Sequence, residues 1–389
     1  MQPFKKTVTR RKMLAFAGTL TASVLGCEGG EAQNAEAPLD LASDLEPIRA
    51  KHDLPALASA VLFKGRLAGL GATGERKYGS GIKVKTSDQF HLGSDTKAMT
   101  AALCGILVDQ RKLKWETTLE EAFHELGSMM SPEYRKVTID QLCSHRSGFS
   151  SESWIAGKSF LEMHQLPGNP REQRALYARA ILQERPVSSP GTTTLYSNRN
   201  FAIAGIIAER RANLDWESLI TKELFKPLGM KSTGFGAMGT PGKIDQPWQH
   251  KKAGGKREAI APGPLSDNPP IIAPAGRAYM PLSEWAKFIQ DQMNGLNGKK
   301  ALLNQKTCLH LHTPNPGEDY VGGWIETTRP WGGGKVYTHT GSNTQNMAVV
   351  WMAPEKDFAV MIATNQAGSD EGIACDEVAG RMIQRFLVK

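Results

Sequence analysis

The sequence predicts an α+β fold: a mostly antiparallel sheet built from both chain ends, flanked by helices, with an inserted and mainly helical domain. Two observations predict this arrangement. Strand-like apolar patterns occur in residues 45–93 and 300–389, whereas helical patterns dominate residues 94–299. The chain has 389 residues, of which 40% are hydrophobic, so it can bury a substantial core.

The strands are predicted from short apolar runs bounded by turn residues. Residues 56–63 and 66–70 flank Lys64-Gly65, a pair typical of a tight hairpin turn. Three further runs follow one another near the C-terminus, at residues 336–340, 347–352 and 358–363. One sheet can therefore contain strands from both ends of the chain.

Helices are predicted where apolar residues recur every three or four positions. The clearest segments are residues 94–110, 171–184, 201–212, 216–225, a segment capped by Ser283, and 373–387. Residues 236–274 are rich in Gly, Pro and Lys and are predicted to form a long loop.

The first 26 residues have the composition of an export signal. They contain no acidic residue, and their apolar run at 13–25 is too short to span a bilayer comfortably. Their five cations account for most of the net charge of +8, so the rest of the chain is close to neutral. No basic helix indicates nucleic-acid binding. These cations are Lys5, Lys6, Arg10, Arg11 and Lys12.

Residues 24–27 resemble a lipoprotein processing site, in which Cys27 would be the lipid-bearing residue; cleavage near Ala35 or Ala37 is the alternative. Arg10 and Arg11 fit a twin-arginine signal, and the general secretory route stays open. Residues 27–44 would form a tether. We therefore expect an exported bacterial protein, periplasmic or anchored to the membrane as a lipoprotein, and a monomer.

A serine and a lysine lie three positions apart at the start of the predicted helix 94–110. Residues with this spacing share a helix face, so Ser94 and Lys97 would lie side by side where the first amides are unpaired. A hydroxyl beside an amine and backbone donors has the parts of an acyl-transfer nucleophile. Because serine is also a common helix cap, this pair alone does not decide the function.

Three motifs in order resemble those of the serine β-lactamases related to class C and of the D-alanyl-D-alanine peptidases, penicillin-binding proteins and esterases that share their fold. Supporting matches occur at residues 142–148, 227–230 and 274–276, and the resemblance covers residues 45–388. The three motifs are Ser94-Asp95-Thr96-Lys97, Tyr196-Ser197-Asn198 and His339-Thr340-Gly341.

The resemblance implies an exported serine hydrolase that cleaves an amide or ester through an acyl-enzyme on Ser94. Lys97 and Tyr196 would take the hydroxyl proton, and either could be the general base. The backbone N–H groups of Ser94 and Ser342 would form the oxyanion hole. The residues implied to bind substrate are Asn198, which would also hold Lys97, and His339, Thr340, Gly341 and Ser342.

His339 departs from the lysine that β-lactamases usually have at this position. A histidine is only partly charged near neutral pH, so it would bind a substrate carboxylate less firmly. The substrate could therefore be a β-lactam, a D-Ala-D-Ala peptide or an ester, and a D-alanyl-D-alanine carboxypeptidase or esterase is an alternative to a true β-lactamase. A non-catalytic protein that binds cell-wall peptides or penicillin is the other alternative. No cofactor or metal is expected.

Several other patterns are predicted to be structural. Ser266-Asp267-Asn268 copies a class A β-lactamase motif, but it lies in the Gly- and Pro-rich loop and is predicted to be a turn. His310 and His312 lack further metal ligands nearby and are expected to face solvent. Arg277 stands where the family often has glycine. His145 and most of the cysteines at 104, 143, 308 and 375 are expected to be structural, with the disulfide state left open.

Overall fold

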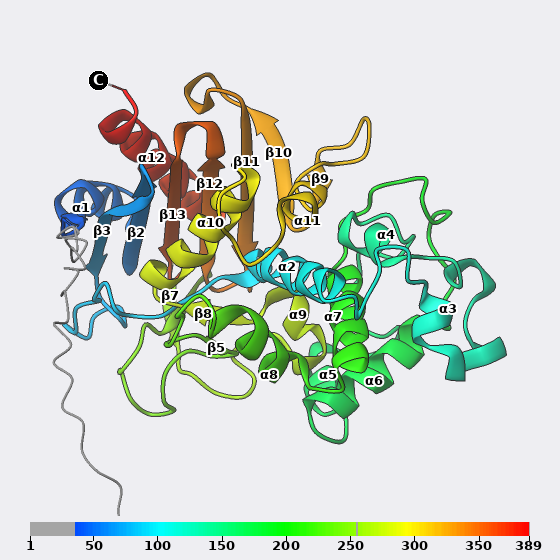
Figure 1. Cartoon of the computed structure of the whole chain (residues 1–389). Coiled ribbons are helices and arrows are strands. Elements are labelled where there is room, and N and C mark those ends of the chain that lie inside the picture. Colours follow the sequence, from blue (N-terminus) through cyan, green and yellow to red (C-terminus); the bar gives the residue numbers. More distant parts are fainter. Residues whose placement is uncertain (1–35, 254–255, 389) are drawn as a thin grey trace, which may run out of the picture. The chain divides into compact units, whose positions relative to one another are not determined.

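The computed structural model describes residues 36–253 and 256–388. The chain divides into the units Met1–Ala37 and Pro38–Lys389, and the second unit contains an eight-stranded sheet (Figure 1). The sheet is antiparallel except where β1 pairs with β3. Its strands, in spatial order, are β1 (Leu39–Asp40), β3 (Arg66–Gly74), β2 (Ala56–Phe63), β13 (Phe358–Thr364), β12 (Met347–Ala353), β11 (Lys335–Ser342), β10 (Trp324–Thr328) and β9 (Tyr320–Val321).

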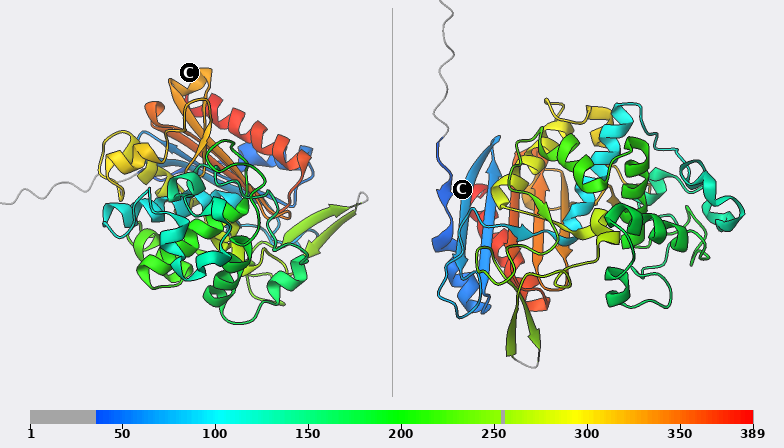
Figure 2. Two further views of the ribbon diagram at one scale, coloured as in Figure 1. Left: turned by 90° about the vertical axis from the view of Figure 1, so that its right-hand side faces the viewer. Right: turned by 90° about the horizontal axis from the view of Figure 1, so that it is seen from below.

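Side chains alternate between the two faces of this sheet, as the pleat requires. On β2, Leu57 and Val61 pack with helices α1 (Ala42–Lys51) and α12 (Ser369–Phe386), whereas Ala58 and Ala60 belong to the core on the opposite face. On that second face α10 (Leu282–Leu296) packs against β2 and β13. The sheet therefore lies between two helical layers (Figure 2).

The remaining helices form a mainly helical region beside the sheet (Figure 1). Its centre is α2, which is buried along most of its length because it consists largely of small apolar residues and packs against α7, α9 and α11. The helices of this region are α2 (Thr96–Asp109), α3 (Leu119–Ala122), α4 (Ile139–Cys143), α5 (Phe160–His164), α6 (Pro170–Ile181), α7 (Asn198–Ala212), α8 (Trp216–Ile220), α9 (Ala273–Gly276) and α11 (Gln305–His310).

Two small sheets lie outside the eight-stranded sheet. β4 (Phe90–His91), directly before the Ser94 segment, pairs with β8 (Ala278–Met280), which in turn pairs with β5 (Gly234–Phe235). The hairpin of β6 (Gln249–Ala253) and β7 (Lys256–Ile260) forms the second sheet. The first of these sheets connects the chain around Ser94 to the chain that follows α9.

The predicted α+β class is confirmed, including the antiparallel sheet that takes strands from both chain ends. The predicted hairpin around Lys64-Gly65 is present as β2 and β3, and the three C-terminal runs form β11, β12 and β13. The long helix α10 lies on the sheet, although its residues fall in the range expected to form the helical domain.

The expected tether at residues 27–44 is wrong over its last part. Residues 39–40 form β1, and α1 begins at Ala42. The sequence pattern concealed this helix because Pro47 lies inside it, and proline is unfavourable in helix interiors. Burial of Leu41, Leu45 and Ile48 against the sheet stabilises the helix despite the proline.

The predicted loop at residues 236–274 contains more regular structure than its composition indicated. The β6–β7 hairpin lies within it, and its strands are polar, so the alternating apolar pattern of a half-buried strand is absent. The expected Ser283 cap is also wrong, because α10 begins at Leu282 and has Pro281 at its N-cap position.

The predicted export signal and the lipid-bearing Cys27 lie outside the described residues. Among the residues that the structure does describe, no helix combines the length and apolarity that crossing a bilayer requires.

A buried ion cluster connects the helical region to the segment that leads into α9. The side chain of Arg174 on α6 is inaccessible to solvent and forms ion pairs with Glu209 on α7 and Glu217 on α8. Its guanidinium also donates to the Pro270 carbonyl at 3.1 Å. Pro270 begins the short turn η5 (Pro270–Ile272) that precedes α9.

Replacing Arg174 by alanine should lower the free energy of unfolding by about 3–5 kcal/mol, because it leaves the Glu209 carboxylate buried without its cation. Urea unfolding followed by circular dichroism measures this change. The matched control is Arg171→Ala on the same helix, where the arginine contacts Asn213 at the surface; we expect a change within about 0.5 kcal/mol. Equal changes in the free energy of unfolding for Arg174→Ala and Arg171→Ala would contradict the stabilising role of the buried Arg174 ion pairs.

Candidate active site

Ser94 and Lys97 lie side by side at the start of α2, as their spacing predicts. Ser94 belongs to the 3-10 turn η1 (Gly93–Asp95), and Lys97 lies in the first turn of α2. The Lys97 Nζ atom lies 2.9 Å from Ser94 Oγ. Ser94 is half-buried and Lys97 is inaccessible to solvent, so the amine lies beneath the hydroxyl.

Two further acceptors surround the Lys97 amine. Asn198 Oδ1, at the start of α7, lies 2.7 Å from Nζ, and the Ala275 carbonyl of α9 lies 2.8 Å from it. Burial lowers the pKa of Lys97 to about 7, and the neighbouring Asp95 opposes this shift. A neutral amine can donate its two N–H bonds to Asn198 and Ala275, which leaves its lone pair directed at the Ser94 hydroxyl.

Tyr196 lies against the same amine. Lys97 Nζ is 4.8 Å from the centroid of the Tyr196 ring. Burial raises the pKa of Tyr196, and a hydrogen bond with the Ser94 side chain opposes this rise. The following residue, Ser197, caps α7 by accepting the N–H of Arg199, so the start of the helix is fixed between Tyr196 and Asn198.

The third motif lies on β11, where exposure alternates along the strand. His339 and Gly341 are buried, whereas Thr340 and Ser342 are exposed. The four residues of β11 that were predicted to bind substrate therefore divide into an inward pair and an outward pair, and only the side chains of the outward pair are open to solvent.

His339 meets Asp95, the residue after Ser94. Its Nδ1 atom lies 3.0 Å from Asp95 Oδ1, and its Nε2 atom lies 3.2 Å from the Tyr320 hydroxyl. Burial, together with the Lys97 charge, lowers the pKa of His339 to about 3. Burial also raises the pKa of Asp95, against the effect of Lys97. Both pKa shifts favour the uncharged forms of Asp95 and His339.

Two glycines bring β11 against the Ser94 turn. A Cβ on Gly341 would lie 1.9 Å from the Leu92 carbonyl oxygen, and a Cβ on Gly93 would lie 2.3 Å from Ser342 N. Gly93 also has a φ of +50°, in the left-handed region that favours glycine. The backbone segments of Ser94 and Ser342 are therefore in direct contact.

Sequence reasoning missed several residues that support this arrangement. Asp95 was visible only as an acidic residue at the start of an apolar helix, and nothing in the local sequence pointed to Tyr320. His145 was predicted to be structural, and it is buried with its ring 4.5 Å from that of Tyr196. Its Nδ1 atom lies 2.9 Å from Asn200 Nδ2, and burial lowers its pKa.

The remaining candidates lie in structural positions. His312 is buried against Trp324, so its expected exposure is wrong, whereas His310 is half-buried and pairs with Asp140. Within the described part of the chain no group of histidine, cysteine and acidic residues could hold a metal ion. The cysteines are free and buried, as expected of small apolar side chains: Cys104, Cys143, Cys308 and Cys375.

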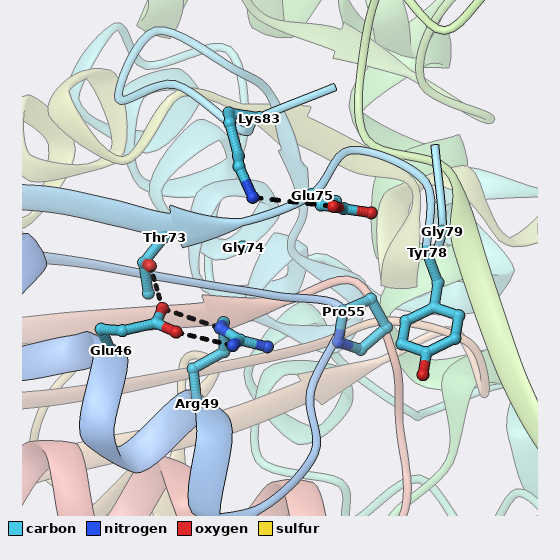
Figure 3. A pocket seen from close by; sticks show the side chains of 9 residues that line it. All are labelled: Glu46, Arg49, Pro55, Thr73, Gly74, Glu75, Tyr78, Gly79 and Lys83. Atoms are coloured by element: carbon cyan, nitrogen blue, oxygen red, sulfur yellow. Dashed lines mark hydrogen bonds and ion pairs between the residues drawn. The ribbon is translucent and has the colours of Figure 1, made fainter. Parts of the chain in front are cut away.

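A separate hollow of about 540 Å³ lies where α1 approaches the end of β3, and none of the motif residues lines it (Figure 3). Its charged side chains are paired with one another. Glu46 accepts hydrogen bonds from Arg49 and Thr73, and Lys83 pairs with Glu75. These charged side chains are therefore paired with neighbours that also line the hollow.

A sequence profile described as Beta-lactamase matches residues 41–380. The chain belongs to the beta-lactamase family. Penicillin-binding protein 4 of Amycolatopsis lactamdurans is 31% identical over 185 residues, which are 48% of this chain and 46% of that protein. Unguisins hydrolase ungD' of Aspergillus campestris is 24% identical over 290 residues, with coverages of 71% and 52%. The chain thus spans about half the length of these curated relatives.

Solved structures of the beta-lactamase family share this fold. The octameric penicillin-binding protein homologue from Pyrococcus abyssi has a TM-score of 0.71 and 20% identity, over 89% of this chain and 78% of that one. The D-alanine carboxypeptidase AmpC from Burkholderia cenocepacia has a TM-score of 0.66 and 19% identity, with coverages of 87% and 97%.

Gly341→Ala should destabilise this family member by about 1–3 kcal/mol or more, because the added methyl group would collide with the Leu92 carbonyl. The midpoint of urea unfolding measures the effect. Gly380→Ala is the matched control, since Gly380 lies inside α12 with open space around it and alanine is the better helix former. If Gly341→Ala unfolded like the wild type, β11 would lie further from the Ser94 turn than described.

Proposed function

We propose that the protein is a serine hydrolase that forms an acyl-enzyme on Ser94 and hydrolyses uncharged esters or amides. The observation that carries this proposal is the 2.9 Å contact between Ser94 Oγ and the buried Lys97 amine. A hydroxyl becomes an effective nucleophile when an adjacent base can accept its proton. Membership of the beta-lactamase family supports a hydrolase, and the contact supports Ser94 as its nucleophile.

Lys97, rather than Tyr196, is the general base in this proposal. Burial moves the pKa of Lys97 down to about 7, whereas it moves the pKa of Tyr196 up. At neutral pH a large fraction of the amine is therefore unprotonated, while the phenol keeps its proton. A base whose pKa lies near the working pH combines the right protonation state with a useful driving force for proton transfer.

The reaction follows from this assignment. Ser94 Oγ attacks the substrate carbonyl carbon while its proton passes to Lys97 Nζ. The negative charge on the former carbonyl oxygen is held by the backbone N–H groups of Ser94 and Ser342. Collapse of this intermediate breaks the bond to the alcohol or amine, which leaves with the proton from Lys97. Water then attacks the acyl carbon and gives a proton to the Lys97 amine. The bond from that carbon to Ser94 Oγ breaks, Oγ takes the proton back from Lys97, and the acid is released.

The environment of His339 supports an uncharged substrate. Both of its ring nitrogens have protein partners, and its low pKa leaves it neutral at physiological pH. It therefore supplies no positive charge for a substrate carboxylate, which favours an ester or internal amide over a penicillin or a D-Ala-D-Ala terminus. A relative named as a hydrolase of unguisins supports the hydrolase class. The alternative of a non-catalytic binding protein is disfavoured by the intact contact between Ser94 and Lys97.

Ser94→Ala should abolish hydrolysis of a p-nitrophenyl ester, with a rate loss of at least about 1,000-fold, because no other group replaces the nucleophile. Mass spectrometry of wild-type protein quenched during turnover should locate the acyl group on the peptide that contains Ser94. Ser218→Ala, on an exposed position of α8, is the control and should keep full activity. Hydrolysis that persists in Ser94→Ala would defeat the proposal. Acylation of the wild type without turnover would favour the binding protein.

The acylation rate should rise with pH and level off above about pH 7, because the base acts only after Lys97 has lost its proton and burial sets that pKa near 7. Stopped-flow measurement of the ester burst between pH 5 and 10 gives the profile. A pH profile with its midpoint near 10, the ordinary pKa region of a phenol or an exposed lysine, would contradict the buried Lys97 amine as the general base.

A further inference from the structure

A buried carboxylate joins the two backbone segments that would form the oxyanion hole. The side chain of Asp267 is almost fully buried, and three side chains contact it, two of them from distant parts of the chain. His91 Nε2 lies 3.1 Å from Oδ2, Asn343 Nδ2 lies 2.8 Å from Oδ1, and Arg277 Nε lies 3.3 Å from Oδ2. Asp267 belongs to the Ser266-Asp267-Asn268 motif that the sequence indicated to be only a turn.

The contact with His91 leads to the Ser94 turn. His91 Nδ1 accepts the N–H of Gly93 at 3.0 Å, so this nitrogen is unprotonated. The ring proton then lies on Nε2 and is donated to Asp267. Because Gly93 directly precedes Ser94, the carboxylate fixes the peptide next to the Ser94 N–H through one histidine ring.

The contact with Asn343 leads to the end of β11. Asn343 directly follows Ser342, and its Oδ1 atom accepts the N–H of Asn346 at 2.9 Å. Its Nδ2 group also lies 2.6 Å from Gln249 Oε1. These bonds fix a turn in which Thr344 has a φ of +74°, a strained value for a β-branched residue. The orientation of the Ser342 peptide therefore depends on a side chain that Asp267 holds.

Arg277 completes the set and balances the charge. Burial alone would raise the pKa of Asp267, but His91, Arg277 and Asn343 together hold it below its ordinary value, so the carboxylate is ionised at neutral pH. The ion pair with Asp267 accounts for the cation at position 277. The backbone is also fixed here, because the Asp267 carbonyl lies 3.0 Å from His164 Nε2.

We propose that Asp267 is a positioning residue for acylation, which holds the backbone N–H groups of Ser94 and Ser342 at the separation that a developing oxyanion requires. This inference rests on the proposed function. Loss of one oxyanion-hole donor lowers kcat by about 100- to 1,000-fold in other enzymes. Displacement of two donors that both remain present should have a smaller effect, and it should fall on the transition state more than on the bound substrate.

Asp267→Asn tests this directly. The amide has nearly the same shape, but its NH₂ group must face at least one of the donors that now meet a carboxylate oxygen. For p-nitrophenyl ester hydrolysis we expect kcat to fall about 10- to 100-fold, with KM changed less than about threefold. A boronic acid that forms a tetrahedral adduct with Ser94 should lose affinity by the same factor, because it mimics the oxyanion. If Asp267 had a purely structural role, the fall in kcat and the loss of boronic acid affinity would not occur by the same factor.

Two further variants complete the experiment. Asp245→Asn is the matched control, since Asp245 accepts the Thr240 N–H in the same loop region and makes none of these contacts; its kcat and boronate affinity should equal those of the wild type. His91→Gln removes the link to Gly93 while Asp267 remains, and should reproduce the coupled losses. If Asp267→Asn does not fold, as judged by circular dichroism, His91→Gln decides the outcome.

The inference is overturned if the folded variants keep kcat within threefold of wild type, or if only KM changes. Failure of the proposed function has a different signature: the wild type itself would show no acylation on Ser94. An active wild type with an unaffected Asp267→Asn therefore removes the inference and leaves the proposed function intact.

Discussion

The burial of one amine constrains the whole helical region. An amine removed from water must have its hydrogen-bond partners supplied by the protein, and Lys97 takes them from the starts of α2 and α7 and from α9. These segments can converge only if their backbones approach closely. Gly205 permits this on α7, because a Cβ there would lie 2.4 Å from the Pro274 ring of α9. Close helix packing is thus a condition for satisfying Lys97.

The sheet meets this convergence along β11, and the contact again depends on small residues. Gly93 and Gly341 allow the backbone of β11 to lie against the Ser94 turn, which brings the Asp95 carboxyl to the inward-facing His339. The alternation of the strand then decides which groups a substrate can reach. Thr340 and Ser342 face outward, whereas His339 is enclosed. The outer surface of this strand therefore presents hydroxyl groups and backbone, while the His339 ring stays enclosed.

The fold class, the main strands and the order of the three motifs could be predicted because they depend on local patterns of apolar residues and on short motifs. The network around the site could not. Asp95 and His339 are 244 positions apart, and His91 and Asp267 are 176 apart, so no local pattern relates them. Asp267 was judged by its neighbours in a Gly-rich loop, although its partners decide its role. Residues 39–44 and the β6–β7 hairpin were missed for the opposite reason, since tertiary packing overrides their weak local signals.

Arg277 and His339, the two unusual residues of the site, are explained by the side chains that they contact. Arg277 would be an unexplained charge near the site, but Asp267 neutralises it, and the anion of that pair is the one that holds His91 and Asn343. His339 would be a weak substitute for lysine, but both of its ring nitrogens have partners inside the protein, Asp95 and Tyr320. Each unusual residue is thus used inside the protein. In the proposed reaction, Lys97 is then the group beside Ser94 whose protonation changes.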